Sequence, residues 1–208
     1  MKSAILTGFE PFGKYESNPT QDLCNELHHE EVDDMEILPL VLPCSYRRAF
    51  SFLHEYIHKF KPEVVIGLGL ASRIKTLRIE TTGKNEMYSK YPDCDGLKPE
   101  REPIIPGART TYRTNTNPES IVDELSKIGV PAKVSNDADS FICNSLIYLT
   151  AGAITEQGLP ISFAYIHTPW TDDYRGKVDL RPNKHTIPKE DLQAAVERVF
   201  MELGQVSL

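Results

Sequence analysis

The sequence predicts a single-domain α/β protein, a three-layer α/β/α sandwich around a mostly parallel, twisted sheet. Strand-like and helix-like patterns alternate along the chain, which is typical of a parallel sheet covered by helices on both faces. The run at 63–67 has the β-branched residues Val64, Val65 and Ile66 at its centre, as in strands that are buried on both sides. A length of 208 residues suits one compact domain. We therefore expect residues 1–208 to form one unit.

The strands are predicted from short apolar runs and from alternating stretches that end at turn residues. We expect them at 4–6, 35–41, 63–67, 74–82, 132–134 and 161–166.

The helices are predicted from apolar residues at helical spacing. We expect them at 18–30, 46–60, 118–128, 139–157 and 188–203. In the second of these, Leu53, Ile57 and Phe60 recur on one face. The third begins with Asn117 as a helix cap and Pro118 at the first helical position.

Residues 83–118 break this regularity, because prolines and glycines interrupt every pattern there. A connection of this length inside a compact domain is usually functional or a contact surface. We expect it to be functional or to form a contact surface.

Composition excludes several classes of protein. The net charge is −7 and no basic stripe is present, which argues against a nucleic-acid partner. No apolar run approaches the length of a membrane span, and the apolar stretch among the first residues is too short for the hydrophobic region of a signal peptide. The four cysteines form no CxxC pair, which argues against a disulfide framework and a zinc knuckle. We expect a cytoplasmic protein with free thiols.

Cys143 is the candidate nucleophile. It lies near the start of a predicted helix, where unpaired N–H groups and the helix dipole favour a thiolate. The same N–H groups can stabilise an oxyanion. Alternatively, Cys143 only fills space in the core.

His167 follows the strand predicted at 161–166 and is the candidate base. Glu80, inside a strand pattern where an unpaired carboxylate would be costly, is the candidate group that orients the imidazole. The alternatives are a buried histidine that ends its strand, and a Glu80 that pairs with Arg78.

Three segments then indicate a family. Residues 7–13 read Thr-Gly-Phe-Glu-Pro-Phe-Gly and are followed by Asn18-Pro19. Residues 140–148 read Ser-Phe-Ile-Cys-Asn-Ser-Leu-Ile-Tyr, and residues 165–169 read Tyr-Ile-His-Thr-Pro. These segments, in this order, resemble those of the pyroglutamyl peptidases (pyrrolidone carboxyl peptidases), and Glu80 followed by Asn85 resembles the surroundings of their glutamate.

The resemblance implies an enzyme that removes an N-terminal pyroglutamate from peptides, with no metal and no cofactor. It implies Cys143 as nucleophile, His167 as general base and acid, and Glu80 as the orienting group. The substrate-binding residues would be Phe9, Phe12 and Asn18, with the lactam ring against the two phenylalanines. It also implies a homo-oligomer, commonly a tetramer.

The chain departs from the family pattern near the glutamate. Leu70 replaces a glutamine, Arg73 lies one position away from the family's arginine, and Thr81 replaces another arginine. These departures leave open a divergent member with altered specificity or without activity.

Two other motifs suggest different functions. His54-Glu55-Tyr56-Ile57-His58 matches the HExxH pattern of zinc proteases, although helical geometry places both histidines away from the buried face. Gly67-Leu68-Gly69 follows a strand like a nucleotide-binding loop, but the third glycine of that fingerprint is missing. Both remain alternatives at this stage.

Overall fold

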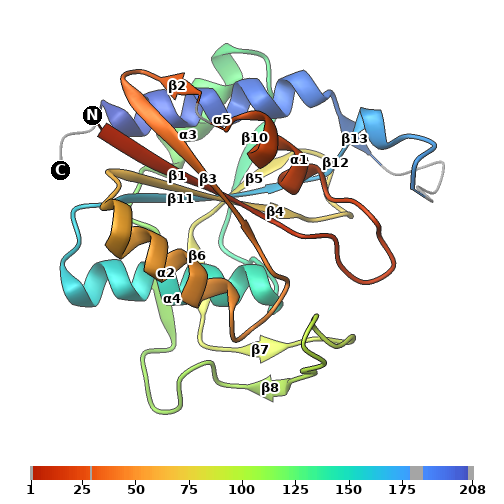
Figure 1. Cartoon of the computed structure of the whole chain (residues 1–208), viewed down its shortest axis with the longest axis vertical. Helices are drawn as coiled ribbons and strands as arrows, with labels where there is room; N and C mark the ends of the chain where they lie inside the picture. Colours follow the sequence, from red (N-terminus) through yellow and green to blue (C-terminus); the bar gives the residue numbers. More distant parts are fainter. Residues whose placement is uncertain (1, 29, 179–184, 206–208) are drawn as a thin grey trace.

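The computed structural model describes residues 2–28, 30–178 and 185–205. A central sheet lies between two layers of helices (Figure 1). The three-layer α/β/α architecture predicted from the alternating pattern is therefore confirmed.

The main sheet has seven strands in the order β10-β5-β11-β4-β1-β3-β2. Four of its six neighbouring pairs are parallel, while β5 runs antiparallel to β11 and β2 runs antiparallel to β3. The sheet is thus mostly parallel, as predicted. The strands are β1 (Lys2–Phe9), β2 (Glu31–Val32), β3 (Met35–Leu42), β4 (Val64–Leu70), β5 (Leu77–Glu80), β10 (Ala132–Ser135) and β11 (Ser162–Thr168).

Five helices cover the two faces of the sheet (Figure 1). One hydrophobic core joins the sheet to α1 (Pro19–Glu26), α3 (Pro118–Lys127) and α5 (Lys189–Gly204). The other joins it to α2 (Ala49–Phe60) and α4 (Ile142–Gln157). Each face of the sheet therefore buries its own set of apolar side chains, as the doubly apolar strands require.

The start of α4 differs from the prediction, which began this helix at Asp139. Asp139 has a φ of 67°, a left-handed conformation, and Phe141 is extended. The helix consequently begins at Ile142, so that Cys143 is its second residue. The chain reversal before the helix, which local periodicity does not reveal, fixes this position.

The segment 83–118 is more regular than expected. β6 (Thr82–Lys84) pairs with β9 (Thr111–Arg113), and β7 (Met87–Tyr88) pairs with β8 (Glu100–Glu102). We call the segment 83–118 the arm, and its strands β7 and β8 lie below α4 in Figure 1. The Asn144 side chain fastens it to the helix with hydrogen bonds to the Lys84 backbone, at 2.8 and 2.9 Å, and to the Glu86 carbonyl, at 2.9 Å.

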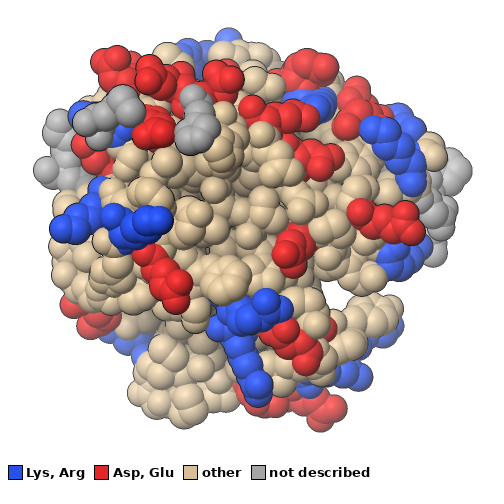
Figure 2. Space-filling model, in the orientation of Figure 1, with Lys and Arg blue, Asp and Glu red and all other residues tan. Residues whose placement is uncertain are grey.

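After β11 the chain forms β12 (Trp170–Thr171), a short 3-10 helix (Asp172–Tyr174) and β13 (Thr186–Ile187). The pattern did not predict these short elements. The predicted strand at 74–82 is also two strands, β5 and β6. No helix of the described residues is long and apolar enough to cross a membrane. Acidic and basic side chains are mixed on the face shown in Figure 2, where no basic stripe is visible.

Candidate active site

A small pocket lies where β1 and β4 end and α4 begins. It contains the two predicted substrate phenylalanines and the predicted nucleophile. The pocket is lined by Phe9, Phe12, Asn18, Cys44, Leu70, Phe141, Ile142 and Cys143. The loops after β1 and before α4 meet here, since the Phe12 and Phe141 rings lie 6.2 Å apart.

Cys143, His167 and Glu80 come together beside this pocket. His167 Nδ1 lies 2.8 Å from Glu80 Oε1, and both side chains are buried. The Cys143 sulfur lies beside the same imidazole: Cys143 Sγ and His167 Cδ2 are each 2.9 Å from the position that a methyl group of Gly69 would take. The two side chains interact electrostatically. Because Nδ1 faces Glu80, Nε2 is the nitrogen that remains for the sulfur. The imidazole therefore connects a buried carboxylate with a thiol.

The strand register explains why His167 and Glu80 meet. Tyr165 is opposite Glu80 in the antiparallel pair of β11 and β5. His167 is two residues further along β11, so it lies on the same face and diagonal to the glutamate. Glu80 is therefore paired with His167 and not with Arg78, as the alternative would require.

Gly69 makes room for the site. It is opposite His167 in the pair of β4 and β11. A methyl group on Gly69 would lie 2.9 Å from Cys143 Sγ, 2.9 Å from His167 Cδ2 and 2.6 Å from Tyr165 Oη. No real side chain tolerates such contacts, so glycine is required where these three groups converge.

The electrostatics of the site favour a protonated imidazole. Burial by itself would lower the pKa of His167, but the negative charge and hydrogen bond of Cys143 and the hydrogen bond and charge of Glu80 outweigh it. Together they raise the pKa of His167 to about 9. At neutral pH the imidazole is consequently protonated and poised to give a proton away.

Cys143 differs from the other three cysteines, and all four are free. Burial raises the pKa values of Cys24 and Cys44, and partial burial raises that of Cys94. Their environments therefore favour the neutral thiol. Cys143 is half-buried, at the N-terminal end of α4, beside a protonatable imidazole. This is the setting of a reactive thiolate.

The three predicted substrate-binding residues line the pocket, but one of them has a different task. Phe9 and Phe12 present their rings there. The Asn18 side chain is fully buried, accepts hydrogen bonds from Thr20 N and Oγ1, and donates one to the Glu10 carbonyl. Asn18 thus caps α1 and holds the loop that carries Phe12.

The three residues that depart from the family pattern lie in different surroundings. Leu70 lines the pocket with its apolar side chain. Arg73 is exposed in the turn that follows β4. The Thr81 hydroxyl donates to the Ser135 carbonyl of β10, at 3.2 Å. Of the three, only Leu70 alters the pocket.

Sequence reasoning missed several residues of the site. Phe141, Ile142 and Cys44 line the pocket, and Tyr165 contacts the point where the three groups meet. The alternation of β11 could have indicated Tyr165, because it is two residues before His167 and shares its face. No local signal could have indicated Cys44, which follows a different strand.

The two histidines of the HExxH motif contact each other, and the described residues offer them no third ligand. His54 and His58 lie on α2 with their Nε2 atoms 3.0 Å apart, in contact with each other. Among the described residues there is no group of three or more His, Cys, Asp and Glu side chains that could hold a metal ion. The zinc protease alternative therefore lacks a ligand set there.

Gly67 and Gly69 have a structural explanation other than phosphate binding. Both lie inside β4, and a methyl group on Gly67 would lie 2.4 Å from the Tyr165 ring. The element that follows is a turn and β5, and no helix begins there to receive a phosphate. The glycines admit Tyr165 and the site, so the nucleotide-binding alternative is wrong.

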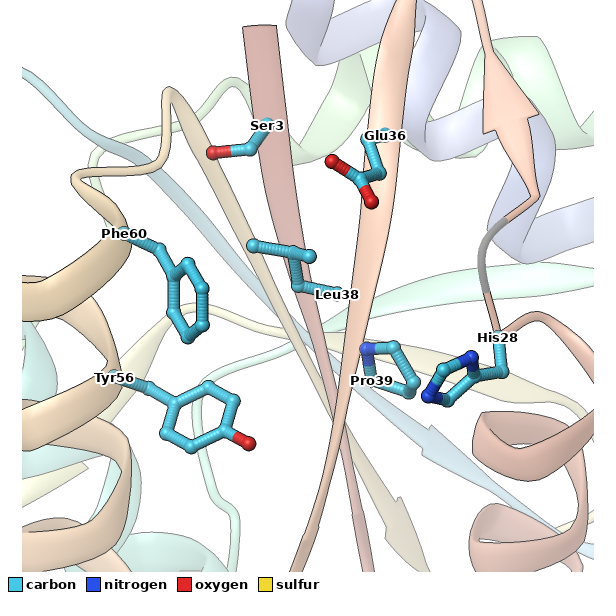
Figure 3. A pocket seen from close by; sticks show the side chains of 7 residues that line it. All are labelled: Ser3, His28, Glu36, Leu38, Pro39, Tyr56 and Phe60. Carbon is cyan, nitrogen blue, oxygen red and sulfur yellow. The ribbon is translucent and has the colours of Figure 1, made fainter.

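A larger cavity, of about 460 Å³, lies between α2 and β3. Figure 3 shows Tyr56 and Phe60 of α2 facing Leu38 across it. Its lining includes Ser3 and Glu36, near the starts of β1 and β3, and none of the predicted site residues. Size therefore does not identify the active site, whereas chemistry does.

The site has the arrangement of a cysteine hydrolase: a thiol at a helix N-terminus, followed by an imidazole and then a buried carboxylate.

Comparisons with known proteins support this class. A family model described as pyroglutamyl peptidase matches residues 2–201. The pyrrolidone-carboxylate peptidase of Pyrococcus furiosus is 32% identical over 204 residues, covering 96% of this chain and 98% of the relative. That of Oceanobacillus iheyensis is 34% identical, covering 95% and 96%.

Solved structures agree as well. The pyrrolidone carboxyl peptidase of Pyrococcus furiosus superposes with a TM-score of 0.91 at 30% identity, covering 99% of this chain and 100% of the other. Pyroglutamyl peptidase I of Bacillus amyloliquefaciens gives 0.92 at 26% identity, covering 99% and 96%. The chain belongs to the pyroglutamyl peptidase family and is a cysteine-type peptidase of that family. The resemblance drawn from three short segments is confirmed.

Proposed function

We propose that this chain hydrolyses the bond after an N-terminal pyroglutamyl residue of peptides, with Cys143 as nucleophile, His167 as base and acid, and Glu80 as the orienting group. One observation carries the assignment of roles: His167 joins Glu80 Oε1, at 2.8 Å, to the Cys143 thiol at the mouth of the pocket. The relatives' names supply the substrate class. The intact arrangement argues against a member without activity.

The reaction follows from these positions. The Cys143 thiolate attacks the pyroglutamyl carbonyl, and free N–H groups in the first turn of α4 stabilise the oxyanion. The protonated His167 gives its proton to the leaving amine, which leaves a thioester on Cys143. Neutral His167 then takes a proton from water, whose oxygen attacks the thioester and releases pyroglutamate. Glu80 holds the imidazole in the required tautomer throughout.

The pocket suits a small, neutral ring. Phe9, Phe12 and Phe141 offer aromatic faces, and Leu70 adds an apolar wall. A pyroglutamyl group carries no ammonium, so the pocket needs no carboxylate to balance a charge. Polar recognition of the lactam falls to backbone groups, because the Asn18 side chain is committed to the cap of α1 and Leu70 offers no hydrogen bond.

Turnover of a pyroglutamyl fluorogenic amide tests this function. We expect hydrolysis by the wild-type protein that resists EDTA, and at least about a 10⁴-fold loss in Cys143→Ala, because no other group can form the acyl intermediate. Cys94→Ala is the matched control, since it removes an exposed thiol. A wild-type protein that is inactive on this substrate, yet whose Cys143 reacts rapidly with iodoacetamide, would indicate altered specificity at Leu70.

The assembly of the chain belongs to the same proposal. A homotetramer is the form implied by the family resemblance, and the arm exposes Tyr88, Tyr91 and Ile105, which suit a subunit contact. Light scattering after size-exclusion chromatography tests the number of subunits. A monomer at micromolar concentration would contradict it.

We further propose that residues 1–208 form one domain and that the protein works in the cytoplasm. Four free cysteines suit a reducing compartment. A single cooperative unfolding transition is expected for one domain. Fractionation of cells with an antibody to the protein tests its location.

A further inference from the structure

The Tyr165 hydroxyl is an unusual polar group in the core of this protein. Tyr165 is fully buried, and its hydroxyl makes no hydrogen bond of normal geometry to any of the described residues. A buried tyrosine hydroxyl normally finds a hydrogen-bond partner, because leaving it without one costs free energy. Its position must therefore be explained by what lies next to it.

The neighbour is the nucleophile. The Tyr165 ring lies across Gly67, and its hydroxyl reaches the space above Gly69. Tyr165 Oη and Cys143 Sγ lie 2.6 and 2.9 Å from one and the same point, the position that a methyl group of Gly69 would take. The ring also packs edge-on against the His167 imidazole, with centroids 5.4 Å apart. Tyr165 thus touches both reacting groups.

The chemistry of the two atoms is complementary. Burial, followed by the charge of Cys143, raises the pKa of Tyr165 well above its usual value, so that the hydroxyl keeps its proton. A permanently protonated hydroxyl can donate, and the sulfur of a thiolate can accept. The sulfur is the acceptor that this hydroxyl has within reach.

We propose that Tyr165 donates a hydrogen bond from Oη to the Cys143 thiolate and acts, together with His167, as a second donor that keeps the nucleophile ionised and in place. This inference rests on the proposed role of Cys143. A hydrogen bond that is made to the charged form of a group stabilises that form. Once the thioester forms, the sulfur loses its charge and the bond weakens.

Tyr165→Phe removes the hydroxyl and keeps the ring that packs on Gly67 and His167. We expect the acid limb of Cys143 alkylation by iodoacetamide to move up by about one pH unit, since a hydrogen bond to a charged group is lost. Below the limb, alkylation should be roughly three- to fourfold slower, and at the high-pH plateau it should be up to about threefold faster, because nucleophilicity rises with the pKa of a thiol. The acid limb of kcat/KM for a pyroglutamyl amide should move with it.

The rate is read from the Cys143 peptide by mass spectrometry, so that the exposed Cys94 does not contribute. Tyr148→Phe is the matched control: it removes a hydroxyl that donates to the Arg109 carbonyl, at 2.7 Å, from another buried tyrosine. Its alkylation profile should be that of the wild type, even if its melting temperature falls.

Superimposable profiles of the wild type and Tyr165→Phe would overturn the inference, as would an equal shift in Tyr148→Phe. A different result identifies a failure of the proposed function itself. If wild-type Cys143 reacted only like an ordinary thiol, with no limb below pH 8, its role as an activated nucleophile would be lost, and the role of Tyr165 with it.

Discussion

Two groups of ionisable side chains lie in different parts of this protein and contrast in how they are held. His54 and His58 are one helical turn apart on α2, packed on each other near the surface. Cys143, His167 and Glu80 come from α4, β11 and β5, and 87 residues separate the glutamate from the histidine. The first group is compact in sequence and lacks a third ligand, whereas the second is dispersed in sequence and continuous in space.

Their environments explain the difference. Burial and then the neighbouring His58 lower the pKa of His54, and the charge of Glu55 offsets this only in part. His167 is buried more deeply, yet Cys143 and Glu80 raise its pKa. A short motif supplies the residue types. An imidazole keeps a proton that it can donate only when negatively charged groups lie on both sides of it. The following predictions test that contrast.

Glu80→Gln should have the largest effect among them. The amide keeps the size of the side chain but cannot balance an imidazolium, and it can turn the imidazole to the wrong tautomer. We expect kcat to fall by roughly 10²- to 10⁴-fold, by analogy with the orienting carboxylate of serine proteases. Steady-state kinetics on a pyroglutamyl amide measure it. Glu86→Gln, in the arm, is the control, and a loss of the same size there would contradict a special role for Glu80.

Gly69→Ala should come next. The added methyl group would displace Cys143 Sγ, His167 and the Tyr165 hydroxyl, each of which lies within 2.9 Å of it. A displacement of about 1 Å between reacting groups can cost on the order of 10²-fold in rate. Kinetics together with a thermal melt separate misplacement from unfolding. Gly152→Ala is the control. Its methyl group would lie 3.0 Å from the Tyr112 ring and would contact no residue of the site, so the variant should keep its activity.

The pH dependence of the rate should show the raised pKa of His167. Protonated His167 gives the proton to the leaving amine, so kcat should fall as the pH rises through about 9. The pKa of His167 in the folded protein lies above its ordinary value of 6.5. The free energy of unfolding therefore includes the full contribution of protonated His167 with its partners Cys143 and Glu80 below pH 6.5. This contribution is lost as the pH rises through about 9. A basic limb near 6.5 would contradict the pairing.

His54→Ala and His58→Ala should have the smallest effect. Neither side chain lines the pocket, so kcat/KM should stay within about twofold of the wild type, as for ordinary surface substitutions. Dialysis against a chelator should likewise leave the rate unchanged. A loss of more than tenfold in either variant, restored by zinc, would reverse the comparison between the two groups.

Local patterns determined much of the molecule. Apolar runs predicted the core strands, helical spacing predicted α2 and the other long helices, and Asn117-Pro118 predicted the start of α3. Three segments around Phe9, Cys143 and His167 were sufficient to indicate the family. These features depend on neighbours in the chain, which is why the sequence reveals them.

The tertiary structure decided the rest. The antiparallel pairing of β5 with β11 brings Glu80 diagonally to His167, and no pattern in either strand states that pairing. The same register explains Gly69, for which local reasoning left a nucleotide-binding loop open as an alternative, and it directs the Tyr165 hydroxyl to the nucleophile. The sequence by itself determined which chemical groups are present, because residue types and short periodicities are local. Their convergence depends on contacts between distant strands, which only the folded sheet provides.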